Sequence, residues 1–125
     1  MSAPIDAEIL AQHAEALIDE LEALENTRAP LFAVYGPGGT WEAERKAMLC
    51  ACAIDIRAEV GDRKVTEAWI DQNAHDHVKY RSRIELAEEE RTQMALLDAQ
   101  IAAKERRYEL AKSRMYALGR MAGLV

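Results

Sequence analysis

One uninterrupted stretch constrains the fold of this chain more than any other feature. Residues 62–118 form a run of 57 residues without Gly or Pro, the two residues that most often interrupt a helix. Within this run, residues 78–118 are predicted to form one helix, and ~40 helical residues extend over roughly 60 Å. A compact chain of this length has a radius of gyration near ~14 Å, so the rest of the chain cannot enclose such a helix. The helix must lie against another long helix, in the same chain or in a second copy.

The composition predicts an all-α fold. Hydrophobic residues make up 50% of the chain, but Ala contributes many of them and aromatic residues only 6%. Few β-branched or aromatic residues are left to build the core of a sheet. Ala, Glu, Leu, Arg and Lys dominate, as they do in long helices and coiled coils. We therefore expect a helical hairpin or bundle with one very long C-terminal helix, completed by oligomerisation.

Two helices and a loop are expected in the first half of the chain. Apolar residues recur at steps of three and four over about residues 6–26 and again over residues 41–60, the period of an amphipathic helix. Thr40 is well placed to cap the second helix, and Gly61 to end it. Residues 27–40 contain two prolines and three glycines, which predicts a loop. Its apolar residues either fill the gap between the helices or dock a partner; they are Leu31, Phe32, Val34 and Tyr35.

A capped short helix is expected next. Thr66 is a suitable N-cap, and Val65 and Ile70 can pack together as a hydrophobic staple across the start of this helix. The helix should end near residues 73–75, where Asn73 can take a left-handed conformation. The long helix follows.

The last third of the long helix carries a heptad pattern. Larger apolar residues alternate steps of three and four there, interrupted only by Lys104 and Ala111, which is typical of a helix that buries one stripe against a partner. The same pattern is weaker towards the N-terminus, where it includes Arg83 and Glu90. The expected packing seam consists of Met94, Leu97, Ile101, Tyr108, Met115 and Leu118.

Charge is unevenly distributed along the chain, whose formal net charge is −6. Residues 1–62 carry 12 acidic and 4 basic side chains, whereas residues 63–125 carry 10 and 12. We expect an acidic two-helix head at 1–62, and at 63–125 a unit in which the short and long helices fold together. Such asymmetry suits head-to-tail self-association or an anion-binding surface at one end.

No motif indicates catalysis or a metal site. His75 and His77 are two residues apart, whereas metal-binding histidines on a helix need a spacing of three or four. The acidic run at residues 88–90 lies beside arginines with which it can pair along the helix, and no Glu-x-x-His motif occurs. The glycine-rich residues 36–39 lack the Lys-Ser/Thr of a phosphate loop. We therefore expect no enzyme, metal, cofactor or small-molecule substrate.

The sequence also favours a cytoplasmic location. Cys50 and Cys52 point to different sides of a helix, so we expect two buried, reduced thiols. Residues 1–6 lack the basic start of a signal peptide. No apolar run approaches the ~20 residues of a membrane span, so no membrane association is expected.

The basic end of the long helix is the candidate binding surface. Its cations lie near Tyr108 and Tyr116, and cations interleaved with aromatic rings can follow a single-stranded nucleic acid. The same cations also suit a solvated helix face near the negative end of the helix dipole. The candidate residues are Lys104, Arg106, Arg107, Lys112 and Arg114.

A capped helix at residues 65–70, followed by a long Glu/Arg-rich helix with tyrosines and a basic end, resembles small helical phage recombination mediators. The resemblance covers residues 63–120 and rests on this pattern; the acidic first half departs from it. Members of this family form rings and help to load a recombinase on single-stranded DNA. The resemblance implies a homo-oligomeric, non-enzymatic accessory protein of the host cytoplasm that binds single-stranded DNA, or a DNA-bound recombination or replication protein. The five candidate cations would then contact backbone phosphates.

An alternative interpretation is a protein–protein interaction module without nucleic-acid contact, such as a phage-type inhibitor, adaptor or assembly chaperone. In that case the acidic first half docks a basic partner or mimics nucleic acid.

Overall fold

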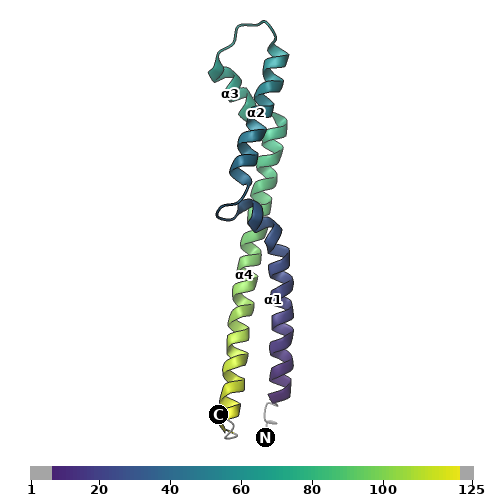
Figure 1. Cartoon of the computed structure of the whole chain (residues 1–125), viewed down its shortest axis with the longest axis vertical. Helices are drawn as coiled ribbons and strands as arrows, with labels where there is room; N and C mark the ends of the chain where they lie inside the picture. The colour runs from purple at the N-terminus through teal and green to yellow at the C-terminus, as the bar shows by residue number, and fades with distance from the viewer. Residues whose placement is uncertain (1–6, 122–125) are drawn as a thin grey trace. The chain divides into compact units, whose positions relative to one another are not determined.

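A computed structural model describes residues 7–121 of the protein, and these contain four helices and no strand. The helices, shown in Figure 1, are α1 (Ala7–Tyr35), α2 (Trp41–Val60), α3 (Glu67–Asp76) and α4 (Val78–Met121). The 44 residues of α4 make it the longest. The predicted all-α fold with one very long C-terminal helix is confirmed.

Helix α1 is longer than expected because it continues through Pro30. The expected helix end near residue 26 and the loop over 27–40 are therefore wrong, and only residues 36–40 separate α1 from α2. A proline inside a helix removes an N–H donor and crowds the preceding turn, at a cost of roughly 3 kcal/mol. The helix persists because Leu31 and Tyr35 continue its half-buried stripe beyond the proline.

Helix α2 has the predicted bounds. Gly61 ends it with a φ of +57°, a conformation that glycine adopts without steric penalty, and its N–H donates to the carbonyl of Arg57. Thr40 occupies the N-cap position, but its side chain makes no capping hydrogen bond.

Helix α3 begins as predicted and ends later. The hydroxyl of Thr66 accepts a hydrogen bond of 3.1 Å from the N–H of Trp69. The break before α4 is made by His77 in an extended conformation, with ψ at 136°. The expected left-handed Asn73 is wrong, since no residue other than glycine has a positive φ within residues 7–121. Asn73 stays helical because its side-chain amide donates to the carbonyl of Trp69, at 2.8 Å.

The chain forms two compact units, and this division differs from the boundary expected at residue 62. Unit 1 contains Met1–Ala29 and Ala95–Val125, and unit 2 contains Pro30–Met94. Within unit 1, α1 and the C-terminal part of α4 lie side by side and run antiparallel (Figure 1). The core of unit 2 joins α2, α3 and the start of α4; its buried residues are Cys52, Ile56, Val60, Ile70, Ala74 and Tyr80. Val65 packs against this core, as a staple residue should.

The two cysteines differ in exposure. Cys52 is buried, whereas Cys50 is exposed, and neither forms a disulfide. The expectation of two buried thiols is therefore correct only for Cys52. None of the helices within residues 7–121 combines the length and the apolar character that crossing a membrane requires.

Candidate interaction surface

Unit 1 is held together where the heptad stripes of two helices meet. On α4, Leu97 is buried, while Ile101, Tyr108, Met115 and Leu118 are half-buried. Met94, the first residue of the expected seam, is half-buried and belongs to unit 2. The stripe on α1 consists of Leu10, Ala14, Leu17, Leu21 and Leu24, all buried or half-buried.

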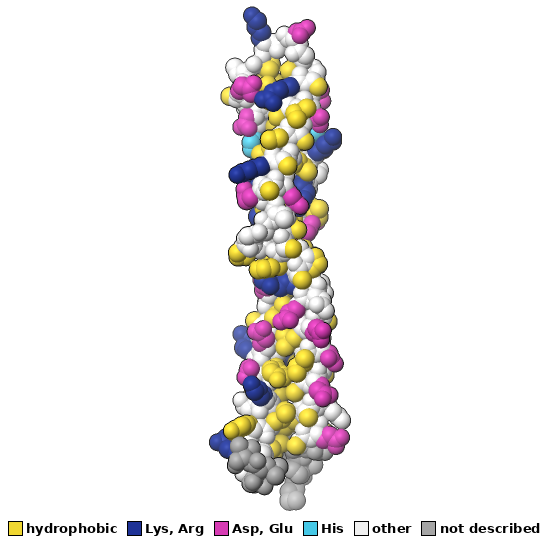
Figure 2. Space-filling model, in the orientation of Figure 1, with side chains coloured by type: hydrophobic (Ala, Val, Ile, Leu, Met, Phe, Trp, Pro, Cys, Tyr) yellow, Lys and Arg dark blue, Asp and Glu magenta, His cyan; other side chains and the backbone are white. Residues whose placement is uncertain are grey.

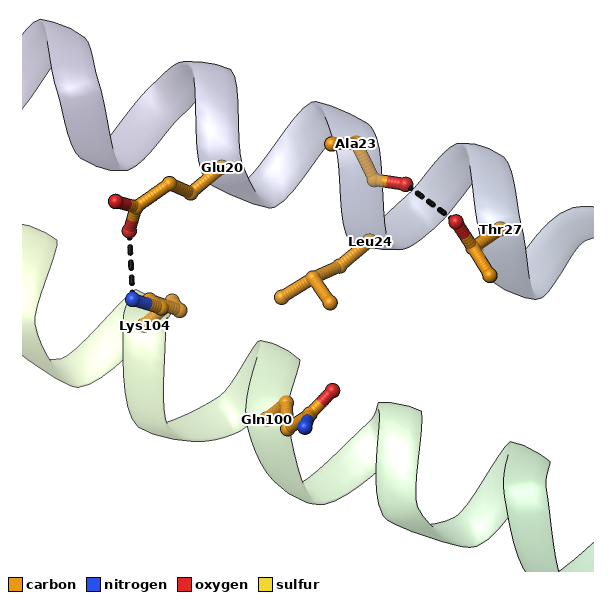
Figure 3. Close-up of a pocket in the computed structure, with 6 residues that line it drawn as sticks. All are labelled: Glu20, Ala23, Leu24, Thr27, Gln100 and Lys104. Carbon is orange, nitrogen blue, oxygen red and sulfur yellow. Dashed lines mark hydrogen bonds and ion pairs between the residues drawn. The ribbon is translucent and has the colours of Figure 1, made fainter.

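Two ion pairs fix the antiparallel register of these helices. The ammonium of Lys104 lies 2.6 Å from a carboxylate oxygen of Glu20, as Figure 3 shows. About two turns further along both helices, Arg28 of α1 pairs with Asp98 of α4. Lys104, the seam residue that interrupts the apolar pattern, is thus matched by an acid on the facing helix.

A groove with a volume of about 370 Å³ runs between the two helices beside the seam. Leu24 and Ala23 give it an apolar floor, and the Glu20–Lys104 pair crosses one end (Figure 3). The hydroxyl of Thr27 donates to the carbonyl of Ala23, at 3.0 Å, so its proton is used within α1. Gln100 completes the lining from α4.

The apolar character of this groove continues along both helices. Gln100 and Lys104 line the groove from α4. Ala103 follows Gln100 by three residues, as Ala23 follows Glu20, so helical spacing places it on the same side of unit 1. Residues seven apart share a side of a helix. The surface so formed, here called the groove face, comprises Ile9, Ala16 and Ala23 of α1 and Leu96, Ala103, Leu110 and Ala117 of α4.

Large apolar side chains of the groove face are open to solvent. Ile9 and Leu96 are each 61% exposed, and Leu110 is 52% exposed. Ile9 therefore lies to one side of the packed stripe of α1. A pair of helices covers only one side of each, so within the described part of unit 1 these residues have no third helix to cover them.

The five predicted cations do not share one side of α4. Lys104 is half-buried in its ion pair, and the other four are exposed. Arg107 and Arg114 lie about 20° apart around the helix, on the groove side, but Arg106 is about 100° and Lys112 about 140° away from Arg107. Their clustering along the sequence therefore does not become one cationic face.

The acids of α1 are better aligned than the cations of α4. Four of the exposed acids lie on the side of α1 away from the seam, and acidic side chains follow one edge of unit 1 in Figure 2. These residues are Glu8, Glu15, Asp19 and Glu22, whereas Glu25 lies beside the seam. Glu20 lies apart from them, and the hydrogen bond and charge of Lys104 lower its pKa, with smaller contributions from Arg107 and His13. Unit 1 thus has one acidic and one basic helix.

Unit 2 contains an arginine–aromatic cluster that the sequence did not indicate. The rings of Tyr35 and Trp41 lie 5.7 Å apart on either side of the 36–40 loop. The guanidinium of Arg83 lies 4.4 Å from the Trp41 ring centroid, and that of Arg91 lies 5.5 Å from the Tyr35 ring. The one sequence feature that could have indicated this cluster is the eight-residue spacing of Arg83 and Arg91, which places both arginines on one side of α4. The cluster closes the loop between α1 and α2.

No group of three or more His, Cys, Asp or Glu residues that could hold a metal ion occurs within residues 7–121. Comparison with known protein families, curated proteins and solved structures gave no match to the chain.

Proposed function

We propose that this protein is a non-enzymatic interaction module that docks a helical protein partner on the groove face of unit 1. The observation that carries the proposal is the pair of apolar stripes left open on α1 and α4, with Ile9, Leu96 and Leu110 more than half exposed. Contiguous exposed apolar surface commonly marks a site of protein association. An apolar groove between two helices suits the apolar side of a third helix.

The residues of the groove face fit this function. Ala16, Ala23 and Ala103 are small, which lets a partner helix approach closely. The charged groups beside them, Glu20 and Arg107, can provide the polar rim that sets orientation and partner choice in protein interfaces.

A second candidate function is single-stranded DNA binding, as the resemblance to recombination mediators implies. The specific observation in its favour lies near the end of α4, where the guanidinium of Arg120 is 5.6 Å from the ring of Tyr116. Tyr116 is 58% exposed, and Arg114 is also exposed nearby. An exposed ring among cations can stack a base.

Protein docking is ranked first because of the electrostatics of unit 1. The cations surround α4 on several sides, whereas neighbouring packed helices lie only about 8–10 Å apart. That distance is close to the Debye length of about 8 Å at physiological salt, so the acids of α1 reduce the positive potential around α4.

Site-specific photo-cross-linking distinguishes the two candidates. A benzophenone amino acid replaces Leu110 on the groove face or Tyr116, which lies about 120° away around the same helix and has similar exposure. In the protein's native cells, we expect a protease-sensitive adduct from position 110 and little from position 116. A nuclease-sensitive adduct at position 116 with none at 110 supports DNA binding instead. Absence of any adduct at both positions contradicts both functions.

A further inference from the structure

We infer that the partner that binds the groove face is a second copy of this chain. This inference rests on the proposed function and identifies its partner. The two copies are related by a two-fold axis parallel to the helices of unit 1. In this arrangement α1 of each copy lies on the C-terminal part of α4 of the other, and the two helix pairs form a four-helix unit.

The register within one copy makes the two groove faces complementary in size. Glu20 is opposite Lys104 and Arg28 is opposite Asp98. Taken together, these two pairs place Ala16 level with Leu110, and Ile9 level with Ala117, to within about one residue. An axis parallel to the helices leaves these levels unchanged in the second copy. In two layers, therefore, an exposed large side chain of one copy meets a small side chain of the other: Leu110 meets Ala16, and Ile9 meets Ala117. In a third layer, Ala23 of one copy meets Ala103 of the other. Alternation of large and small residues is what allows facing helices to interdigitate.

Charge complementarity selects this arrangement over the other face-to-face dimer. Residues 7–29 of α1 contain six acids and only one base, Arg28, whereas residues 95–121 of α4 contain six bases and three acids. An axis perpendicular to the helices would place α1 on α1 and bring like charges together. The parallel axis instead places the acidic helix on the basic one. Asp19 of one copy then lies level with Arg106 of the other at the outer rim.

The groove itself tolerates a second copy because it contains both signs of charge. Glu20 is already paired with Lys104, and the charge of Arg107 also reaches it within one copy. The opposite side of unit 1 is less suitable, because Glu25 and Glu105 lie there with Lys112 between them, while Asp98 is already paired with Arg28.

The first test is the molar mass in solution. Light scattering coupled to size-exclusion chromatography should give twice the chain mass of 14.0 kDa. Leu110→Glu places a charge in the interface and should produce a monomer. Tyr116→Glu, a matched change at a similarly exposed side chain of α4 away from the groove face, should remain a dimer.

The second test uses exposed residues, so that folding is not in question. Asp19→Arg and Arg106→Asp should each raise the dimer dissociation constant by about 3- to 10-fold, because the symmetric dimer contains two such rim pairs. The double variant should return to within about 2-fold of the original value, since the pairs are restored with reversed polarity. Sedimentation equilibrium at two salt concentrations measures these constants. Higher salt should shrink the single-variant effects.

A protein that is monomeric at every concentration overturns this inference. So does a dimer that survives Leu110→Glu, or a double variant weaker than both single variants. These outcomes leave the proposed function intact if photo-cross-linking at position 110 still captures a different protein. Loss of that adduct as well overturns both.

Discussion

Arg83 joins three parts of unit 2, the end of α1, the start of α2 and the first turns of α4. Its guanidinium donates to the hydroxyl of Tyr35 at 2.9 Å and to the carboxylate of Glu44 at 3.3 Å, while it lies over the ring of Trp41. Burial lowers the pKa of Arg83, but the hydrogen bond to Tyr35 and the charges of Tyr35, Glu44 and Glu90 outweigh this, and the net pKa is raised. The arginine is therefore charged at every practical pH, and its contacts hold the 36–40 loop in place.

Removal of this side chain should destabilise unit 2. Arg83→Ala should lower the free energy of unfolding by about 1–3 kcal/mol, because a cation–π contact and a hydrogen bond are lost together. Urea denaturation followed by circular dichroism measures the change. Arg81→Ala, at an exposed position of the same helix, should change it by less than about 0.5 kcal/mol. Equal effects of the two variants would show that the cluster contributes nothing to stability.

The Glu20–Lys104 pair predicts a specific acid sensitivity of unit 1. Lys104 lowers the pKa of Glu20 from its usual value of 4.5, so the unfolded chain takes up this proton at a higher pH than the folded one. The stabilisation is complete above pH 4.5 and is lost as the pH falls through the lower, folded-state pKa. Glu20→Gln should therefore be less stable than the original protein at neutral pH, with a difference that shrinks as the pH falls below 4.5. Urea denaturation at several pH values measures the difference, with Glu22→Gln, on the outer side of α1, as the matched control variant.

At the level of the elements, two threonines precede helices but only one caps its helix. Thr66 accepts a hydrogen bond from the N–H of Trp69, whereas Thr40, with a φ of −87° and a ψ of −7°, makes no side-chain capping bond. An N-cap residue normally has an extended backbone that aims its oxygen at the first turn. Thr40 is already helical, so its side chain points elsewhere.

The two positions should respond differently to the same substitution. Thr66→Ala should lower the free energy of unfolding by about 1 kcal/mol, because an N–H of α3 loses its partner. Thr40→Ala should cost less than about half of that. Thermal unfolding of the two variants provides the comparison, and a larger effect at Thr40 would contradict the assignment of the caps.

Pro30 lies inside α1, where its ring interrupts the backbone hydrogen bonds. Pro30→Ala should raise the free energy of unfolding by about 1–3 kcal/mol, because alanine restores the missing N–H and relieves crowding of the preceding turn. Chemical denaturation at equal protein concentration measures this gain. Destabilisation by Pro30→Ala would show that the proline ring itself packs favourably.

The sequence predicted those elements whose signals are local. Thr66 and Gly61 act within a few residues, and the heptad of α4 repeats every turn or two, so these features followed from spacing. Pro30 was misread because its local cost is outweighed by the packing of Leu31 and Tyr35, which depends on other parts of the chain. The contact between Arg83 and Tyr35 joins residues 48 positions apart and had no local signal. The spread of the cations around α4 required the angle of each residue on the helix, which clustering along the sequence conceals.

At the scale of the whole molecule, the two units differ in how much apolar surface each one buries. The core of unit 2 draws on three helices and includes Cys52, which is only 1% exposed. Unit 1, in its described part, is a pair of helices that leaves Ile9 and Leu110 exposed. Regions with few buried apolar contacts open more readily than well-packed ones. Unit 1 is therefore the part whose stability should depend on a partner.

Hydrogen exchange should reveal this dependence. In dilute protein, the amides of residues 10–25 and 100–118 should exchange faster than those of residues 48–60 in α2. At concentrations where copies associate, the first two segments should gain protection and the third should not, because association stabilises only the state that binds. Mass spectrometry of peptides from both concentrations measures the effect. Uniform protection across the chain, independent of concentration, would contradict it.

The unequal exposure of the two cysteines has a practical consequence. Cys50 is open to solvent and Cys52 is enclosed in the core of unit 2. A thiol-reactive fluorophore therefore has one attachment point on the folded protein and a second only after unit 2 unfolds. The natural chain can carry a single dye at a known place without any substitution. Energy transfer between donor- and acceptor-labelled chains can then follow the exchange of copies in real time.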